Sequence, residues 1–95
     1  MSKTRMAVAG AGLIGQAHIR VLQASPSCAL SAVVDPSPAA AAVAAQAGVP
    51  LFTSLDALLA NDRPDGVVLA TPNALHLPQA LQCIAAGVPV LVEKP

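Results

Sequence analysis

Three glycines with the spacing G-x-G-x-x-G lie close to the N-terminus, and an acidic residue, Asp35, follows twenty residues after the third. Short apolar residues precede the first glycine, Gly10, and an amphipathic segment follows the last, Gly15. This order predicts a strand, a tight turn and a helix, so that bare backbone amides and a helix N-terminus face one point. Such a point attracts negative charge, and the pattern as a whole predicts binding of the diphosphate of a dinucleotide.

Each of these residues has a separate predicted role. Gly10 lets the chain reverse, Gly12 lets a diphosphate approach bare backbone, and Gly15 removes a side chain where helix meets strand. Asp35 is expected to bind the ribose hydroxyls of the adenosine and to repel a 2′-phosphate, which predicts NAD rather than NADP. Two alternatives stay open: a glycine turn that serves only close packing, and an Asp35 that only begins a turn before Pro36.

Apolar runs and turn residues predict five strands that alternate with four helices. The predicted strands are residues 4–9, 30–34, 51–53, 66–70 and 88–92. The predicted helices are residues 38–47, 55–60 and 77–86 in addition to 13–24, and residues 71–73 are expected to form a turn.

Ser37 and Ser54 are the predicted N-caps of the second and third helices, and Pro78 is expected in the first turn of the fourth. The second helix has almost no large side chains, so it is expected to lie close to a neighbouring element. The first helix is expected to bury Ile14, Ala17, Val21 and Leu22 as one stripe. The alternation predicts an α/β fold, a doubly wound parallel sheet of the Rossmann type with strand order 3-2-1-4-5.

Polar residues follow the predicted strands at their carboxyl ends, where such sheets bind ligands. Thr71 and Asn73 follow the fourth strand, and Glu93 and Lys94 follow the fifth. Together with the glycines and the acid after the second strand, they predict a single cleft. Simpler interpretations stay open, in which Thr71 and Asn73 only cap the next turn and Lys94 is a solvated chain end.

The two histidines and two cysteines show no spacing typical of metal ligands, so no metal is expected. His76 lies beside the predicted cleft, although a lone histidine is more often a surface or packing residue. His18, on the first helix, is expected to be structural. Cys28 and Cys83 are expected to be reduced, partly buried thiols of a cytosolic protein.

The composition excludes several classes of function. Apolar residues make up 55% and charged residues 11% of the 95 residues, and the formal net charge is zero. The few Lys and Arg residues are scattered and Phe52 is the single aromatic residue, so no nucleic acid and no membrane surface is expected as a partner. Polar residues interrupt the first apolar stretch too early for a signal peptide, and no stretch has the length of a membrane span. A cytoplasmic location is therefore expected.

Four stretches together resemble the N-terminal part of the Gfo/Idh/MocA family, the group of glucose-fructose oxidoreductase and inositol dehydrogenase. They are residues 9–15 (AGAGLIG) with His18, 33–35 (VVD), 70–73 (ATPN) with Leu75 and His76, and 87–95 (GVPVLVEKP). Their order and spacing cover the whole chain, and the closing Glu-Lys-Pro is the most specific of them.

The resemblance implies an NAD(P)-dependent oxidoreductase that acts on a sugar, cyclitol or related polyol and forms a homo-oligomer. It implies that the diphosphate contacts Gly10, Gly12, Leu13, Ile14 and Gly15, and that the adenosine ribose contacts Asp35. It implies that the nicotinamide half of the cofactor meets Thr71, Asn73, His76, Glu93 and Lys94. Lys94 is further implied to be catalytic, by orienting the reacting hydroxyl or assisting its proton movement, and to precede a cis peptide bond with Pro95.

Members of that family continue past this point into a last strand and a substrate domain. The chain is therefore expected to be a cofactor-binding domain truncated before both, and to be inactive alone. A bare edge strand and uncovered apolar helix faces would favour self-association. A non-catalytic dinucleotide-binding module, or a domain for FAD or S-adenosylmethionine, are the alternatives.

Overall fold

Strands and helices alternate strictly in the computed structural model, which describes residues 3–93. The strands are β1 (Thr4–Ala9), β2 (Cys28–Val34), β3 (Leu51–Phe52), β4 (Gly66–Leu69) and β5 (Val90–Val92). The helices are α1 (Leu13–Ala24), α2 (Ala40–Ala47), α3 (Leu55–Asn61) and α4 (Asn73–Ala85). All of the predicted elements are present, and β1 and α1 have the predicted bounds.

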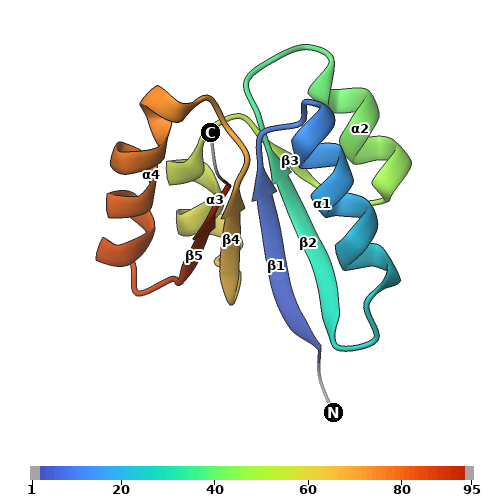
Figure 1. Cartoon of the computed structure of the whole chain (residues 1–95), viewed down its shortest axis with the longest axis horizontal. Coiled ribbons are helices and arrows are strands. Elements are labelled where there is room, and N and C mark those ends of the chain that lie inside the picture. Colours follow the sequence, from blue (N-terminus) through green and yellow to red (C-terminus); the bar gives the residue numbers. More distant parts are fainter. Residues whose placement is uncertain (1–2, 94–95) are drawn as a thin grey trace.

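The strands form one parallel sheet with the order β3-β2-β1-β4-β5, which confirms the predicted topology. Helices α1 and α2 cover one face of this sheet, and α3 and α4 cover the other (Figure 1). Strands β2 and β3 are added on one side of β1, and β4 and β5 on the other, so the strand order reverses between β1 and β4. In doubly wound sheets, ligands bind beside the carboxyl ends of the strands at this reversal.

The central strands supply both cores because their side chains alternate between the two faces. Ala7 and Ala9 contact the core under α3 and α4, whereas Val8 between them contacts the core under α1 and α2. These three side chains have no exposed surface. Ala40 and Ala44 of α2 are also buried, and their small size lets this helix lie close to the sheet, as expected.

The predicted start of the last helix is wrong. Helix α4 begins at Asn73, four residues earlier than predicted, and Pro72 is its N-cap residue. Pro78 was expected in the first turn, yet it lies inside the helix. A proline here removes the hydrogen bond to the carbonyl of Ala74, which is tolerated because Ala74 lies in the exposed first turn.

The predicted buried stripe of α1 is also wrong. Ile14 and Val21 are 53% and 67% exposed, whereas Gly15 and Ile19 are the buried residues of this helix. Helix α1 packs against the preceding turn at Gly15, so its buried face runs along Gly15 and Ile19. The prediction followed the large apolar residues, and Gly15 is not one of them. Leu22 is half-buried against the same core.

Smaller differences concern element ends. Strand β2 begins two residues earlier than predicted, and β5 begins two residues later, after Pro89. Helix α2 begins at Ala40, two residues later than predicted, and its N-cap residue is Ala39 rather than the predicted Ser37. The cap of α3 is confirmed, because the Oγ of Ser54 accepts a hydrogen bond from the amide of Ala57 at 3.1 Å.

Apolar side chains remain exposed on the β5 side of the molecule. Leu77, Leu81 and Ile84 form a stripe along α4, and β5 is the edge strand of the described sheet. The expected uncovered helix face is therefore observed, and self-association stays a prediction. Cys28 and Cys83 are unpaired, as expected, and burial raises the pKa of the Cys83 thiol. Within residues 3–93 no helix is long and apolar enough to cross a bilayer.

We expect Leu58→Ala to lower the free energy of unfolding by about 3 kcal/mol, because Leu58 is completely buried between α3 and the sheet. Leu81→Ala is the matched control on an exposed helix surface, and its effect should stay below about 0.5 kcal/mol. Urea unfolding followed by far-UV circular dichroism measures both. Equal losses in the two variants would contradict this description of the core.

Candidate functional site

The carboxyl ends of the strands meet at one cleft of about 1270 Å³. Gly10 follows β1, Asp35 follows β2, Thr71 comes after β4 and Glu93 follows β5, and all four line this cleft. The expected convergence is therefore observed. The predicted site residues along the cleft are Gly10, Gly12, Leu13, Ile14, Asp35, Thr71, Asn73, His76 and Glu93.

Two of the three glycines are required by the fold itself. Gly10 has a φ of +101°, and a Cβ there would lie 2.6 Å from the carbonyl oxygen of Ala70. A Cβ on Gly15 would lie 1.7 Å from the carbonyl oxygen of Gly10. Both distances are far too short for real contacts, so the turn and α1 can pack together only with glycine at these positions. Gly15 lies beneath the cleft rather than on its surface.

Gly12 differs from its two neighbours in the motif. A Cβ on Gly12 would meet no protein atom within 4 Å, and its φ of −76° suits any residue. Nothing in the described chain therefore requires glycine here, whereas a ligand that approaches the bare backbone would. The approach of a diphosphate to the bare backbone at Gly12 stays a prediction, and the space beside this residue is open.

The N-terminus of α1 opens into the same space. No side chain caps this helix, and its first hydrogen bond runs from the amide of Gln16 to the carbonyl of Gly12 at 2.9 Å. The amides of Leu13 and Ile14 precede that bond, and both residues line the cleft. Since no Lys or Arg is among the described lining residues, an anion here would be held by backbone amides and the helix dipole.

Asp35 is held by the backbone on both sides. Its Oδ2 accepts a hydrogen bond from the amide of Ala11 at 2.8 Å, and its Oδ1 accepts one from the amide of Ser37 at 2.8 Å. Burial alone would raise the pKa of this carboxyl, but the bonds from Ser37 and Ala11 outweigh burial and lower it. Asp35 is therefore an ionised acceptor directly attached to the glycine turn. Because the Ala11 amide is 24 residues away in sequence, Asp35 does more than start a local turn.

Thr71 and His76 form a second connected group, on the β4 side. The Oγ1 of Thr71 donates a hydrogen bond to the Oε1 of Gln79 at 2.5 Å, and the Nε2 of His76 donates one to the carbonyl of Thr71 at 2.6 Å. Because a carbonyl only accepts, the ring proton lies on Nε2, and the Nδ1 of a neutral ring is an acceptor. No side chain caps α4, so Thr71 and Asn73 do not act as its caps.

Glu93 connects the end of β5 to α1. Its Oε2 lies 2.6 Å from the Nε2 of His18, and its amide donates to the carbonyl of Leu69 at 3.0 Å. His18, which was expected to be structural, is bonded to a residue that lines the cleft, and its structural role stays a prediction. Lys94, predicted to be catalytic, and the Lys94–Pro95 bond lie outside the described residues.

Several cleft residues were not predicted from the sequence. Ser37 and Gln79 fix the orientation of predicted site residues, while Gln82 donates to Asp56 at 2.7 Å and both line the cleft. The bonds of Ser37 and Gln79 join residues close in sequence, whereas the bond between Gln82 and Asp56 exists only once α3 and α4 are packed together, so no local pattern marks it. Between residues 3 and 93, no three His, Cys, Asp or Glu side chains gather where they could hold a metal ion.

The chain matches known proteins over almost all of its length. Residues 4–95 match the family described as the oxidoreductase family with an NAD-binding Rossmann fold, GFO_IDH_MocA. Inositol 2-dehydrogenase of Corynebacterium glutamicum is 38% identical over 99 residues, which cover 100% of this chain and 29% of that protein.

Solved structures give the same result. GenD2 from gentamicin A biosynthesis, in complex with NAD, is 44% identical with a TM-score of 0.92, and the match covers 100% of this chain and 28% of that one. Scyllo-inositol dehydrogenase from Lactobacillus casei, with bound NAD(H) and scyllo-inositol, is 25% identical with a TM-score of 0.91, covering 99% and 28%. This chain therefore spans less than a third of the length of these relatives.

The glycines predict two distinct phenotypes. Gly15→Ala should lower the free energy of unfolding by more than about 3 kcal/mol, because its Cβ would overlap the carbonyl of Gly10. Gly12→Ala should cost less than about 1 kcal/mol and weaken dinucleotide binding by about tenfold or more. Thermal unfolding measures stability, and calorimetric titration with NADH measures binding. Wild-type affinity in Gly12→Ala would show that no ligand approaches this position.

Asp35 predicts a defined acid dependence of stability. Its folded pKa is lowered, so it stabilises the fold above the unfolded value near 3.8, and that stabilisation is lost as the pH falls through the folded pKa. We therefore expect the free energy of unfolding to fall less steeply between about pH 5 and about pH 2 in Asp35→Asn than in the wild type. Urea unfolding at a series of pH values gives the two slopes. Identical slopes would refute the role given to the Ala11 and Ser37 amides.

Proposed function

The chain belongs to the Gfo/Idh/MocA family of oxidoreductases, and we propose that it binds NAD as the cofactor domain of an enzyme that acts on a sugar, cyclitol or related polyol. In this proposal residues 1–95 belong to the NAD-binding domain, and substrate selection belongs to a separate domain. The reaction is the transfer of a hydride between the nicotinamide ring and a hydroxyl-bearing carbon.

The hydrogen bond from the amide of Ala11 to Asp35 is the observation that carries the proposal. It joins the predicted ribose acceptor to the turn whose open face, at Gly12, suits a diphosphate. Two groups that a dinucleotide would use at once are thereby held at a fixed separation before any ligand arrives. Preorganisation of this kind lowers the entropic cost of binding.

A preference for NAD over NADP follows from the charges along the cleft. Asp35, Asp56 and Glu93 line it, whereas none of its described lining residues is Lys or Arg. The 2′-phosphate of NADP would lie beside the Asp35 carboxylate without a cation to pair with. The repulsion disfavours NADP, while the free lone pairs of the carboxylate can accept hydrogen bonds from ribose hydroxyls.

The named relatives support the substrate class, since they include an inositol 2-dehydrogenase and a scyllo-inositol dehydrogenase solved with its inositol. The nicotinamide, when bound, accepts or donates the hydride. Thr71, Asn73, His76 and Glu93 are proposed to bind its half of the cofactor. Lys94 is proposed as the catalytic residue, which orients the substrate hydroxyl or assists its proton movement.

The remaining parts of the proposal concern the whole enzyme. A homo-oligomer and a cytoplasmic location stay predictions from the sequence and the family resemblance. Neither a nucleic acid nor a membrane is proposed as a partner. A dinucleotide-binding module without turnover is the competing function, and a panel of polyols with NAD, followed by absorbance of NADH, separates the two.

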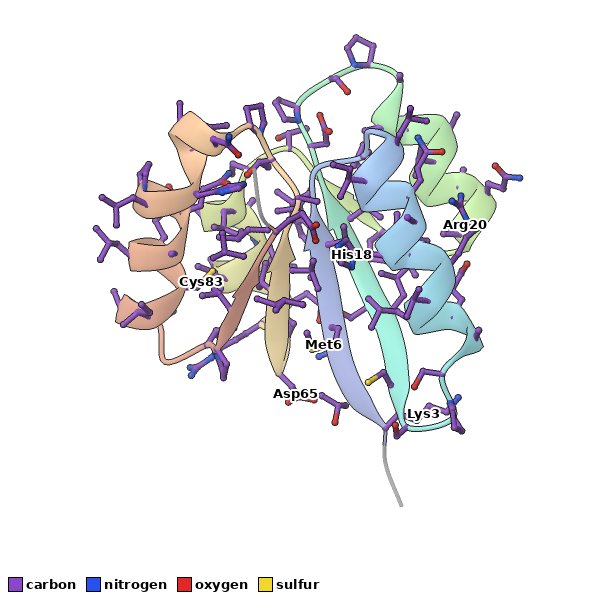
Figure 2. The ribbon with its side chains drawn as sticks, in the orientation of Figure 1. Lys3, Met6, His18, Arg20, Asp65 and Cys83 are labelled. Atoms are coloured by element: carbon purple, nitrogen blue, oxygen red, sulfur yellow. The ribbon has the colours of Figure 1, made fainter. Side chains whose placement is uncertain are left out.

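Titration of the chain with NADH, NAD and NADP tests the cofactor assignment. We expect NADH and NAD to bind, and Asp35→Ser to reduce the preference for NAD over NADP by about tenfold, because the repelling carboxylate is removed. Asp65→Ser is the matched control, since Asp65 lies at the opposite end of the sheet (Figure 2), and its preference should equal that of the wild type. A folded chain that binds no nicotinamide nucleotide would exclude the proposed function.

A further inference from the structure

A hydrogen bond joins α4 to α3, the two helices that cover one face of the sheet (Figure 1). The Nε2 of Gln82 donates to the Oδ1 of Asp56 at 2.7 Å, across 26 residues of sequence, and both residues line the cleft. Because a carboxylate only accepts hydrogen bonds, the nitrogen of this amide, and not its oxygen Oε1, faces Asp56. The bond therefore fixes the orientation of the Gln82 amide.

The amide of Gln82 keeps a free edge toward the cleft. A primary amide has two N–H donors and a carbonyl acceptor, and the described part of the chain engages one of those donors. Two neighbouring polar side chains use their acceptor oxygens elsewhere. The Oγ of Ser54 accepts from the amide of Ala57, and the Oε1 of Gln79 accepts from Thr71. Gln82 thus offers an adjacent donor and acceptor to a ligand.

The side of the cleft formed by α3 and α4 is mainly apolar around this amide. Leu75, Gln79 and Gln82 are spaced i, i+4 and i+7 along α4, so they share one face of the helix, and all three line the cleft. Leu55, at the start of α3, lines it as well and is 4% exposed, whereas Leu75 is 44% exposed. We call these four residues and Asp56 the α3–α4 wall. Such a wall suits a flat ring with hydrogen-bonding groups on its edge.

The α3–α4 wall begins directly beside Asp35. The amide of Asp35 donates to the carbonyl of Phe52, the last residue of β3, at 3.0 Å, and α3 begins three residues later. In the proposed function Asp35 binds the adenosine ribose, so the base attached to that ribose has this wall within reach. This step rests on the proposed function, because it takes an adenosine dinucleotide as the ligand. The connection from β2 to α2 contributes Pro36, Ser37 and Ala39 to the cleft, and none of them carries an amide side chain.

We propose that Gln82 recognises the adenine base of the dinucleotide and that Asp56 is the positioning residue for this contact. The Oε1 of Gln82 accepts from the exocyclic amine of adenine, and the second N–H of its Nε2 donates to the ring nitrogen beside that amine. A glutamine amide is a common partner of adenine in this bidentate manner. Asp56 holds the first N–H and so decides which end of the amide meets the amine.

Asp56 converts this contact into discrimination between bases. Hypoxanthine has a carbonyl oxygen in place of the exocyclic amine of adenine, so this oxygen would face the Oε1 of Gln82. Rotation of the amide would relieve that repulsion, but it would place Oε1 against the carboxylate of Asp56. Hypoxanthine is therefore disfavoured in either orientation, whereas adenine fits the orientation already present.

The test compares NADH with its hypoxanthine analogue, reduced nicotinamide hypoxanthine dinucleotide, at neutral pH. The two share the same fluorescent nicotinamide, so one assay gives both dissociation constants, and the sequence contains no Trp or Tyr to add protein emission. The wild type should bind NADH about tenfold or more tightly than the analogue, which is the discrimination that a good bidentate contact provides.

Two substitutions separate recognition from positioning. Gln82→Met removes both ends of the amide and should bring the two dissociation constants to within about twofold of each other, chiefly by weakening NADH. Asp56→Asn releases the amide, because an asparagine side chain can pair with either end of it. This variant should tighten binding of the analogue more than that of NADH, so that their ratio falls by about threefold or more. A merely structural role of Asp56 would leave the ratio unchanged.

Each substitution has a matched control. Gln46→Met changes a glutamine that lines the separate groove between α1 and α2. Asp65→Asn changes an aspartate at the opposite end of the sheet (Figure 2). Both controls should keep the wild-type ratio of the two dissociation constants.

Equal affinity of the folded wild type for NADH and the analogue would overturn this inference and leave the proposed function intact. A wild-type ratio in Gln82→Met or in Asp56→Asn would overturn it as well. Should Gln82→Met fail to fold, as judged by circular dichroism, Asp56→Asn decides, because Asp56 is an exposed residue. A folded wild type that binds neither nucleotide would overturn both this inference and the proposed function.

Discussion

The hydrogen bond between the Ala11 amide and the Asp35 carboxylate is the constraint on which the part of the cleft beside β1 and β2 depends. It ties the end of β2 to the turn after β1, and the amide of Ser37 fixes the second carboxylate oxygen. A carboxylate held by two amides remains ionised and keeps lone pairs for a ligand. The same bond therefore orders the turn, keeps Asp35 ionised and sets the distance between the turn and the carboxylate.

Backbone groups rather than cationic side chains define the site that we propose for the diphosphate. The turn contributes uncapped amides at the start of α1, and none of the described residues that line the cleft is Lys or Arg. This solution demands close packing, because amides act only at short range. The contact between Gly15 and Gly10 meets that demand, since any Cβ at Gly15 would move α1 away from the turn. At Gly12, by contrast, a Cβ would meet no protein atom, so the space in front of the turn stays open.

The parts of the fold and site that sequence predicted are those encoded by neighbouring residues. The strand order, the glycine turn, the acid after β2 and the cap at Ser54 all follow from short patterns. The start of α4 was missed because Pro78 resembles a first-turn proline, whereas Pro72 is the residue that precedes the helix. The pairing of His18 with Glu93 was missed for a different reason: the contact exists only after α1 and β5 are placed on the sheet.

Helix α1 contributes both to the glycine turn, which local sequence predicts, and to the His18–Glu93 contact, which it does not. Its first turn presents amides to the cleft, and one turn later His18 reaches Glu93 on the far side of the strand reversal. A helix moves as a rigid body, so any change that shifts α1 against β1 displaces the amides and the imidazole together. The close contact at Gly15 fixes that position. A glycine with no side chain of its own thereby sets the relative geometry of both halves of the cleft.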